Sequence, residues 1–258
     1  MIPESHGDPI HKRARPFKGL SFNKMIPNMI TLLALCAGMS AIRFGFENRW
    51  ELAAFSIVAA AILDTLDGRV ARFLKGSSKF GAELDSLADF ISFGVAPGIM
   101  LYLWALQGSG RFGWILALIF ASCMALRLAR FNTLLDDPDA PAWKANFFSG
   151  TPAPAGAGLA LLPLVLSFQI GDDLVRRPEV VSVVLILTSI LVVSRVPTFS
   201  FKKLKIPGPW VMTTLVAFVV LVAASFSAPW TPLTCVLALY IISMPFSIRK
   251  HAALSKSE

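Results

Sequence analysis

Four aspartates with helical spacing are the residues of this sequence best suited to chemistry. They lie in the stretch from Asp64 to Asp89, which reads DTLDGRVARFLKGSSKFGAELDSLAD. Asp64 and Asp67 are three residues apart, and Asp85 and Asp89 are four apart, so each pair projects from one face of a helix. A helical hairpin that turns at residues 75–81 brings all four carboxylates to one pocket. We therefore expect an acidic site built from two neighbouring helices.

This acidic site is expected to hold metal ions. Four carboxylates in one pocket repel one another and need a strong compensating positive charge. The histidines lie in the tails, and the cysteines lie inside apolar stretches without metal-site spacing. Ligation by oxygen alone is typical of Mg²⁺, Mn²⁺ or Ca²⁺ rather than zinc. Four carboxylates suit two ions, the arrangement that stabilises the attacking and leaving oxygens in phosphoryl transfer.

Residues between the two aspartate pairs suit a substrate that carries phosphate. Gly68 and Gly81 let a phosphate or nucleotide group approach the backbone closely. Arg72 offers a planar donor fork to a phosphate. Any single aspartate at the end of a membrane span can be an ordinary interface residue, so the expectation depends on the whole spacing.

Transmembrane helices are the elements expected to position these residues. The chain has 258 residues, of which 55% are hydrophobic and 16% charged, and its mean hydropathy is +0.65. Soluble domains average about 25% charged residues, and a soluble α/β protein would show apolar runs of about four to eight residues. Here the apolar blocks approach the roughly 20 residues that cross a bilayer. The sequence thus predicts an all-α, polytopic membrane helical bundle.

Eight spans are expected in this bundle. They cover residues 26–46, 50–72, 82–106, 112–135, 152–170, 180–197, 209–227 and 231–248. We divide the chain into a basic N-terminal segment at the cytoplasmic surface (1–25), a catalytic core of six helices (26–197), and two additional helices with a short cytoplasmic tail (198–258).

Charge asymmetry sets the expected orientation. Most of the 24 basic residues fall in the tails and in the loops after even-numbered spans. Basic residues favour the cytoplasmic side, so both termini and the aspartates are expected on the cytoplasmic face of the inner membrane. The net charge of +8 indicates contact with anionic membrane lipids. No basic stretch carries the interleaved aromatics or the fold signature of nucleic-acid binding, so no nucleic-acid partner is expected.

The aspartate stretch resembles the signature of the CDP-alcohol phosphatidyltransferase family. Written Asp-x2-Asp-Gly-x2-Ala-Arg-x8-Gly-x3-Asp-x3-Asp, all eight fixed residues are present over 26 positions. The resemblance implies a six-helix core of that family and a homodimer. It also implies a two-metal site open to the cytoplasm, loaded with Mg²⁺ or Mn²⁺. Such enzymes transfer the phosphorylated part of a CDP-linked donor, here CDP-diacylglycerol, to an alcohol and release CMP.

The resemblance also implies a role for each matched residue. Asp64, Asp67 and Asp85 bind one metal ion, and Asp64, Asp85 and Asp89 bind the other. Asp89 is in addition the general base. The first span opens Pro27-Asn28-Met29-Ile30-Thr31, similar to the family's Pro-Asn-x-x-Thr start; helix capping after the proline is the alternative explanation. Contacts to the CDP-lipid are implied for Asn28, Thr31, Gly68, Arg72, Ser78 and Gly81.

Three further stretches resemble a branch of the family that uses serine as the acceptor. They are SFGVAPG (92–98), RLARFN (127–132) and FSGTPAPA (148–155). The carboxylate of L-serine requires a cation, and Arg127 and Arg130 lie at a suitable membrane depth. Topology and lipid headgroup contact are the alternative roles for both arginines.

Other functions fit parts of the pattern. Glycerol 3-phosphate, choline or inositol are alternative acceptors for the same chemistry. Choline would favour an aromatic cage, and the two tyrosines lie away from the expected pocket. A divalent-cation transporter is the alternative from another class, because carboxylates in a membrane often mark ion pathways. The clustering at one side and the lack of an internal repeat argue against transport.

Overall fold

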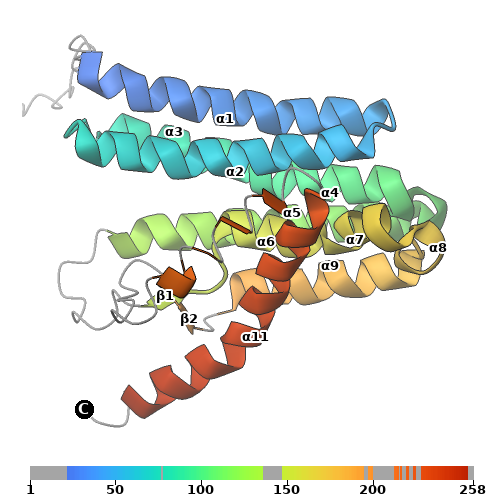
Figure 1. Ribbon diagram of the computed structural model, residues 1–258. Helices are drawn as coiled ribbons and strands as arrows, with labels where there is room; N and C mark the ends of the chain where they lie inside the picture. The colour runs from blue at the N-terminus through green and yellow to red at the C-terminus, as the bar shows by residue number, and fades with distance from the viewer. Residues whose placement is uncertain are drawn as a thin grey trace, which may run out of the picture.

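The computed structural model describes residues 22–76, 78–135, 147–194, 197–199 and 228–254, with eight further residues between 212 and 224. The expected span at 209–227 lies mostly outside these residues, as does most of the N-terminal segment 1–25. The described chain is a bundle of helices with roughly parallel long axes, crossed obliquely by the last helix (Figure 1). The prediction of an all-α membrane bundle is confirmed.

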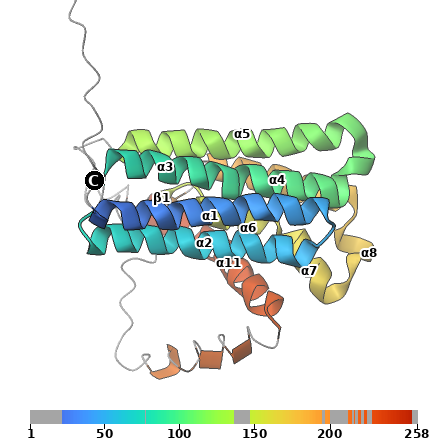
Figure 2. The ribbon, with the colours of Figure 1, turned by 90° about the horizontal axis from the view of Figure 1, so that it is seen from above.

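The first two helices form an antiparallel hairpin. Helix α1 (Phe22–Phe46) and helix α2 (Trp50–Phe73) lie side by side along their whole length (Figure 2). Small side chains such as Ala41, Ala53 and Ala60 are fully buried and let the two backbones approach closely. Asn48 makes the turn with φ of 56°, a conformation that asparagine tolerates better than most residues.

The third segment is a rod made of alternating α- and π-helical turns. It runs from α3 (Lys79–Asp89) through η1 (Phe90–Val95) and α4 (Ala96–Leu101) to η2 (Tyr102–Leu106). The wide turn of η1 ends just before Pro97, whose ring excludes an ordinary hydrogen bond to residue 93. A short 3-10 turn, η3 (Gln107–Ser109), follows, and α5 (Gly110–Leu135) packs back along the rod.

The second half of the bundle contains shorter helices and one small ribbon. Helices α6 (Ala153–Ala160) and α7 (Leu162–Ile170) meet at a bend of 46°. The short α8 (Asp172–Val175) leads to α9 (Pro178–Val193), and α11 (Trp230–Leu254) crosses α6 and α7. Strands β1 (Phe147–Ser149) and β2 (Pro197–Phe199) pair antiparallel, a detail that the all-α prediction did not include.

The bundle is apolar on both its inner and its outer surfaces. Phe93, Met100, Phe120 and Met124 are almost completely buried between the third segment and α5. Large apolar side chains are also exposed on the outer faces of the helices. They include Met29, Leu33, Leu118, Leu126, Leu187 and Ile190. An exposed apolar surface of this kind is unfavourable in water and is typical of contact with membrane lipids.

Most expected spans coincide with helical segments. Those at 26–46, 50–72, 82–106, 112–135 and 152–170 match the structure to within a few residues. The span expected at 180–197 ends earlier, at Val193, because the backbone leaves the helix at Ser194 and enters β2 at Pro197. By length and composition, two described helices are long and apolar enough to cross a membrane, or three with the bent pair. The count of eight spans stays a prediction.

Candidate active site

The turn between α2 and α3 gathers the aspartates. Helix α2 ends at Phe73, and Lys75 adopts a φ of 49° in the turn that follows. Ser78 then caps α3, because its hydroxyl accepts a hydrogen bond of 3.0 Å from the backbone N–H of Gly81. Both helices therefore present their acidic faces at the same end of the bundle, where α1 begins and α5 ends (Figures 1 and 2).

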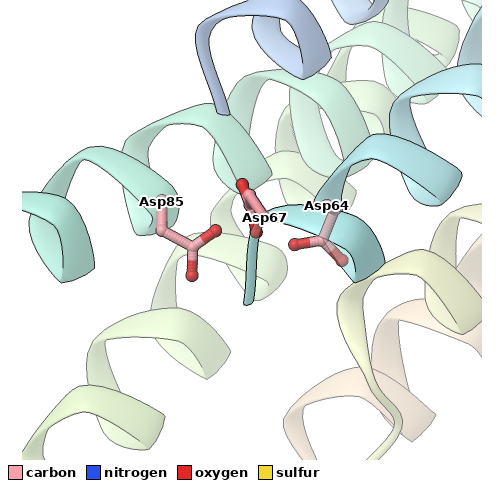
Figure 3. Close-up of side chains that lie close together, drawn as sticks. All are labelled: Asp64, Asp67 and Asp85. Carbon is pink, nitrogen blue, oxygen red and sulfur yellow. The ribbon is translucent and has the colours of Figure 1, made fainter. Parts of the chain in front are cut away.

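Three of the carboxylates form a compact cluster. One oxygen each of Asp64, Asp67 and Asp85 lies within 4.8 Å of the others. Figure 3 shows Asp67 between the other two, with Asp64 and Asp67 on α2 and Asp85 on α3. The convergence expected from the spacing is therefore present in the fold.

Asp89 joins the cluster through Asp64. It is the last residue of α3, one turn beyond Asp85, and its carboxyl group lies beside that of Asp64. The π-helical turn η1 begins with the next residue, Phe90. Single π turns often occur at functional sites because they shift the register of the side chains that follow.

Asp67 has the most enclosed environment of the three clustered aspartates. Its relative exposure is 5%, and its Oδ2 accepts a hydrogen bond of 2.5 Å from the hydroxyl of Thr31 on α1. The backbone of Gly68 also hydrogen-bonds to this carboxylate. The resemblance assigned Thr31 to the CDP-lipid, but in the structure its hydroxyl contacts an aspartate.

The other expected donor contacts surround the cluster at the start of α1 and the end of α2. A Cβ atom placed on Gly81 would lie 2.9 Å from Oδ1 of Asn28, so a larger residue there would displace the Asn28 side chain. Arg72 is exposed, and its guanidinium lies beside Gly68, 3.6 Å from the position of a Cβ there. Ser78 joins this group through its hydrogen bond with the backbone of Gly81.

The two arginines of the RLARFN stretch have different surroundings. Arg127 is 9% exposed, and its charge interacts with those of Asp89 and Asp64. Its Nε has no hydrogen-bond partner among the residues that the structure describes. Arg130 instead donates to the carbonyls of Val193 (2.8 Å) and Ser194 (3.1 Å) at the end of α9. Both arginines were expected to bind serine. The guanidinium of Arg130 already donates two hydrogen bonds to the protein, so fewer of its donors remain for a serine carboxylate.

Asn132 is a residue near the site that the sequence interpretation did not assign. Its side-chain amide donates to the hydroxyl of Ser86 at 2.9 Å, which links the end of α5 to α3 beside Asp85. The available signal was its place as the last residue of the RLARFN stretch. Contacts between residues 46 positions apart cannot be deduced from helical spacing.

The cluster fits a divalent cation. Its ligand atoms are carboxylate oxygens, the type that Mg²⁺, Mn²⁺ and Ca²⁺ prefer. Three such oxygens, all within 4.8 Å of one another, form a group that could hold a metal ion. The carboxyl of Asp89, in contact with Asp64, extends the acidic surface on one side. The described residues can thus bind a metal where the sequence predicted one.

Comparisons with known proteins agree with this geometry. The family model for CDP-alcohol phosphatidyltransferase matches residues 24–195. The protein named CDP-diacylglycerol–serine O-phosphatidyltransferase from Mycobacterium tuberculosis (strain ATCC 25618 / H37Rv) is 38% identical over 233 residues, which cover 90% of this chain and 81% of that protein. Its namesake from Helicobacter pylori (strain ATCC 700392 / 26695) is 33% identical over 218 residues, covering 84% and 88% respectively.

The family model covers well over half of the chain, including every aspartate of the cluster and the arginines of α5. The Mycobacterium leprae (strain TN) protein of the same name matches a similar extent, 90% of this chain at 38% identity. The signature that the sequence displayed lies inside the region that the family model matches. This chain belongs to the CDP-alcohol phosphatidyltransferase family.

Proposed function

We propose that this chain transfers the phosphatidyl group of CDP-diacylglycerol to the hydroxyl of L-serine and releases CMP. The observation that carries the proposal is the carboxylate cluster of Asp64, Asp67 and Asp85, with Asp89 in contact with it. The relatives named for this reaction supply the choice of donor and acceptor. Family membership favours this transferase over the divalent-cation transporter.

The aspartates are proposed to bind two divalent ions, Mg²⁺ or Mn²⁺. Asp64, Asp67 and Asp85 hold one, and Asp64, Asp85 and Asp89 hold the other. When bound, such ions neutralise the diphosphate of the donor and the charge that develops on the leaving phosphate. Asn28, Gly68, Arg72, Ser78 and Gly81 are proposed to contact the nucleotide and diphosphate, since they lie at the start of α1, the end of α2 and the start of α3, near the aspartates.

Asp89 is proposed as the general base. It accepts the proton of the serine hydroxyl as that oxygen forms a bond to the phosphorus of the phosphatidyl group. The bond from this phosphorus to the CMP oxygen breaks in the same displacement, and CMP leaves with the electron pair. The place of Asp89 at the end of α3, beside the charge of Arg127, supports a role at the acceptor side of the cluster.

Arg127 is proposed to bind the carboxylate of serine. A buried guanidinium whose Nε lacks a partner in the described chain favours an anionic ligand, because an unsatisfied buried donor is costly. Arg130 is proposed to stabilise this site without contacting the substrate. Its two bonds to the end of α9 fix the last turns of α5, which carry Arg127.

A groove on the side of α2 is proposed to hold acyl chains of the donor. It has a volume of about 410 Å³ and is bounded by α2, α6, α7 and α11. Its walls are almost entirely apolar, with Thr65 and Arg69 at the end near the aspartates. Pro154, from the FSGTPAPA stretch, is part of its lining. A lipid chain could therefore stay within the bilayer while its headgroup reacts.

The orientation in the membrane, the extent of the catalytic core and the oligomeric state are proposed from the charge distribution and the family resemblance. Arg69, Arg72, Lys75 and Lys79 flank the aspartates, which supports an active site and both termini on the cytoplasmic side of the inner membrane. We propose residues 26–197 as the catalytic core and 198–258 as an addition to it. A homodimer surrounded by membrane lipids is proposed from the family resemblance.

A panel of acceptors tests the proposed function. The detergent-solubilised protein, given CDP-diacylglycerol and Mn²⁺, should release CMP rapidly with L-serine and slowly with glycerol 3-phosphate, inositol or choline. Thin-layer analysis of the lipid product identifies which alcohol has been used. Faster CMP release with another acceptor would contradict serine as the substrate but leave the family chemistry in place.

A further inference from the structure

The contact between Thr31 and Asp67 crosses from one helix of the hairpin to the other. Thr31 lies on α1 and Asp67 on α2, 36 positions apart, and both are almost completely buried. Their O···O distance of 2.5 Å is typical of a hydroxyl that donates to a charged carboxylate. The same hydroxyl lies 3.1 Å from the carbonyl of Pro27. A hydroxyl has a single proton, and the shorter bond to the stronger acceptor takes it.

Packing along one face of α1 holds Thr31 in this place. Thr31, Ala34 and Gly38 follow helical spacing on one face. The hydroxyl of Ser92 in η1 donates to the carbonyl of Ala34 at 3.3 Å. A Cβ atom on Gly38 would overlap Ser92, so the glycine permits α1 to approach the third segment closely. These contacts, one and two turns beyond Thr31, fix the position of α1 relative to the third segment, which carries Asp85 and Asp89.

We infer that Thr31 is a positioning residue for Asp67, which orients this carboxylate toward the metal, rather than a contact to the donor nucleotide. The inference rests on the proposed function. Thr31 donates one hydrogen bond to Oδ2 of Asp67, and the carboxylate keeps its other acceptor sites for the cation. Carboxylates that bind metals are commonly held by a hydrogen bond of this kind, and removal of the partner costs about 10- to 100-fold in metal affinity or activity.

Direct metal binding tests the inference. Thr31→Val keeps the shape of the side chain but removes the hydroxyl, whereas Thr31→Ser keeps the hydroxyl. Mn²⁺ binding to the full-length protein in detergent, without substrates, is measured from the EPR signal of free Mn²⁺. We expect Thr31→Val to weaken Mn²⁺ binding by about 10- to 100-fold and Thr31→Ser to bind as the wild type does. With Mn²⁺ at saturation, the apparent affinity for CDP-diacylglycerol should be unchanged in both variants.

Two comparisons keep the test decisive. Thr188→Val removes an equally buried threonine from α9, which carries none of the aspartates, and should leave Mn²⁺ binding unchanged. Melting curves without metal report whether each variant folds, and Thr31→Ala replaces Thr31→Val should the latter not fold. Normal Mn²⁺ binding by Thr31→Val, together with weaker binding of CDP-diacylglycerol, would overturn the inference and return Thr31 to the donor site. No Mn²⁺ binding by the wild type would overturn the proposed metal site as well.

Discussion

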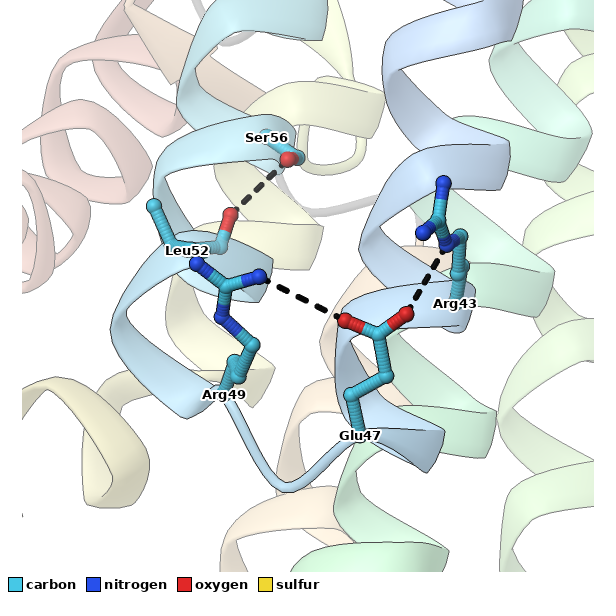
Figure 4. A network of polar contacts seen from close by, with 5 residues as sticks. All are labelled: Arg43, Glu47, Arg49, Leu52 and Ser56. Atoms are coloured by element: carbon cyan, nitrogen blue, oxygen red, sulfur yellow. Dashed lines mark hydrogen bonds and ion pairs between the residues drawn. The ribbon is translucent and has the colours of Figure 1, made fainter.

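The two ends of the α1–α2 hairpin differ in whether their carboxylates form salt bridges. At the turn between the helices, Glu47 pairs with Arg43 at 2.9 Å and with Arg49 at 3.6 Å (Figure 4). At the other end, Asp64 and Asp67 form no salt bridge with the basic residues that the structure describes. One end is neutralised by its own chain, whereas the other retains a negative charge. Carboxylates that no salt bridge neutralises favour binding of a cation from outside.

Metal removal should give the largest difference between the two ends. A chelator such as EDTA should abolish CMP release, because the four carboxylates would repel the diphosphate of the donor without cations between them. Added Mg²⁺ or Mn²⁺ should restore activity. The ion pairs of Glu47 need no metal, so the melting temperature of the metal-free protein should change much less than its activity. Full activity in excess chelator would refute a metal-dependent reaction.

Asp89→Asn should have the next largest effect, and it should lower turnover rather than the affinity for the substrates. The amide has nearly the same shape but cannot take the proton of serine, and general base catalysis contributes about 10²- to 10⁴-fold. Steady-state kinetics should show a fall in kcat of this size, with apparent affinities for serine and CDP-diacylglycerol near those of the wild type. A retained kcat with weaker binding of the donor would instead assign Asp89 to the donor site.

Substitution of Arg127 should weaken serine binding, whereas substitution of Arg130 should lower the stability of the protein. Arg127→Ala leaves the serine carboxylate without its partner in a buried site, at a cost of about 2–4 kcal/mol or roughly 30- to 1000-fold in apparent serine affinity. The affinity for CDP-diacylglycerol should stay nearly constant. Kinetics at varied serine and fixed donor measure the difference.

Arg130→Ala is the matched comparison. It removes the bonds to Val193 and Ser194, so we expect a lower melting temperature and less folded enzyme. The folded fraction should bind serine with an affinity close to that of the wild type. A selective loss of serine affinity in this variant would show that Arg130 also contacts the acceptor.

The sequence predicted the helices well because hydropathy is a local property. The ends of α1, α2 and α5 fall within a few residues of the expected spans. The early end of α9 and the β1–β2 ribbon were missed, since both depend on pairing between segments 50 residues apart. The π turns of the third segment were also missed, because hydropathy does not distinguish a π turn from an α turn.

The acidic residues of the site could be predicted from the sequence, but the residues that hydrogen-bond to them and hold the neighbouring helices could not. Helical spacing placed Asp64 with Asp67 and Asp85 with Asp89, and the hairpin brought the pairs together. Spacing carries no information on which residue of α1 faces Asp67, or on which carbonyls Arg130 meets 63 and 64 positions away. These contacts depend on how helices pack side by side, and the roles that the resemblance implied for Thr31 and Arg130 stay predictions.

Glu47→Gln should have the smallest effect and tests the contrast most directly. The Arg43 and Arg49 side chains are 76% and 57% exposed, and exposed ion pairs contribute about 0–1 kcal/mol each. The variant should therefore melt close to the wild type and release CMP at the same rate. Asp67→Asn removes one carboxylate from the same hairpin and should weaken Mn²⁺ binding strongly. If Glu47→Gln reduced activity as much as Asp67→Asn did, the turn would be coupled to the site, and the two ends could no longer be treated as independent.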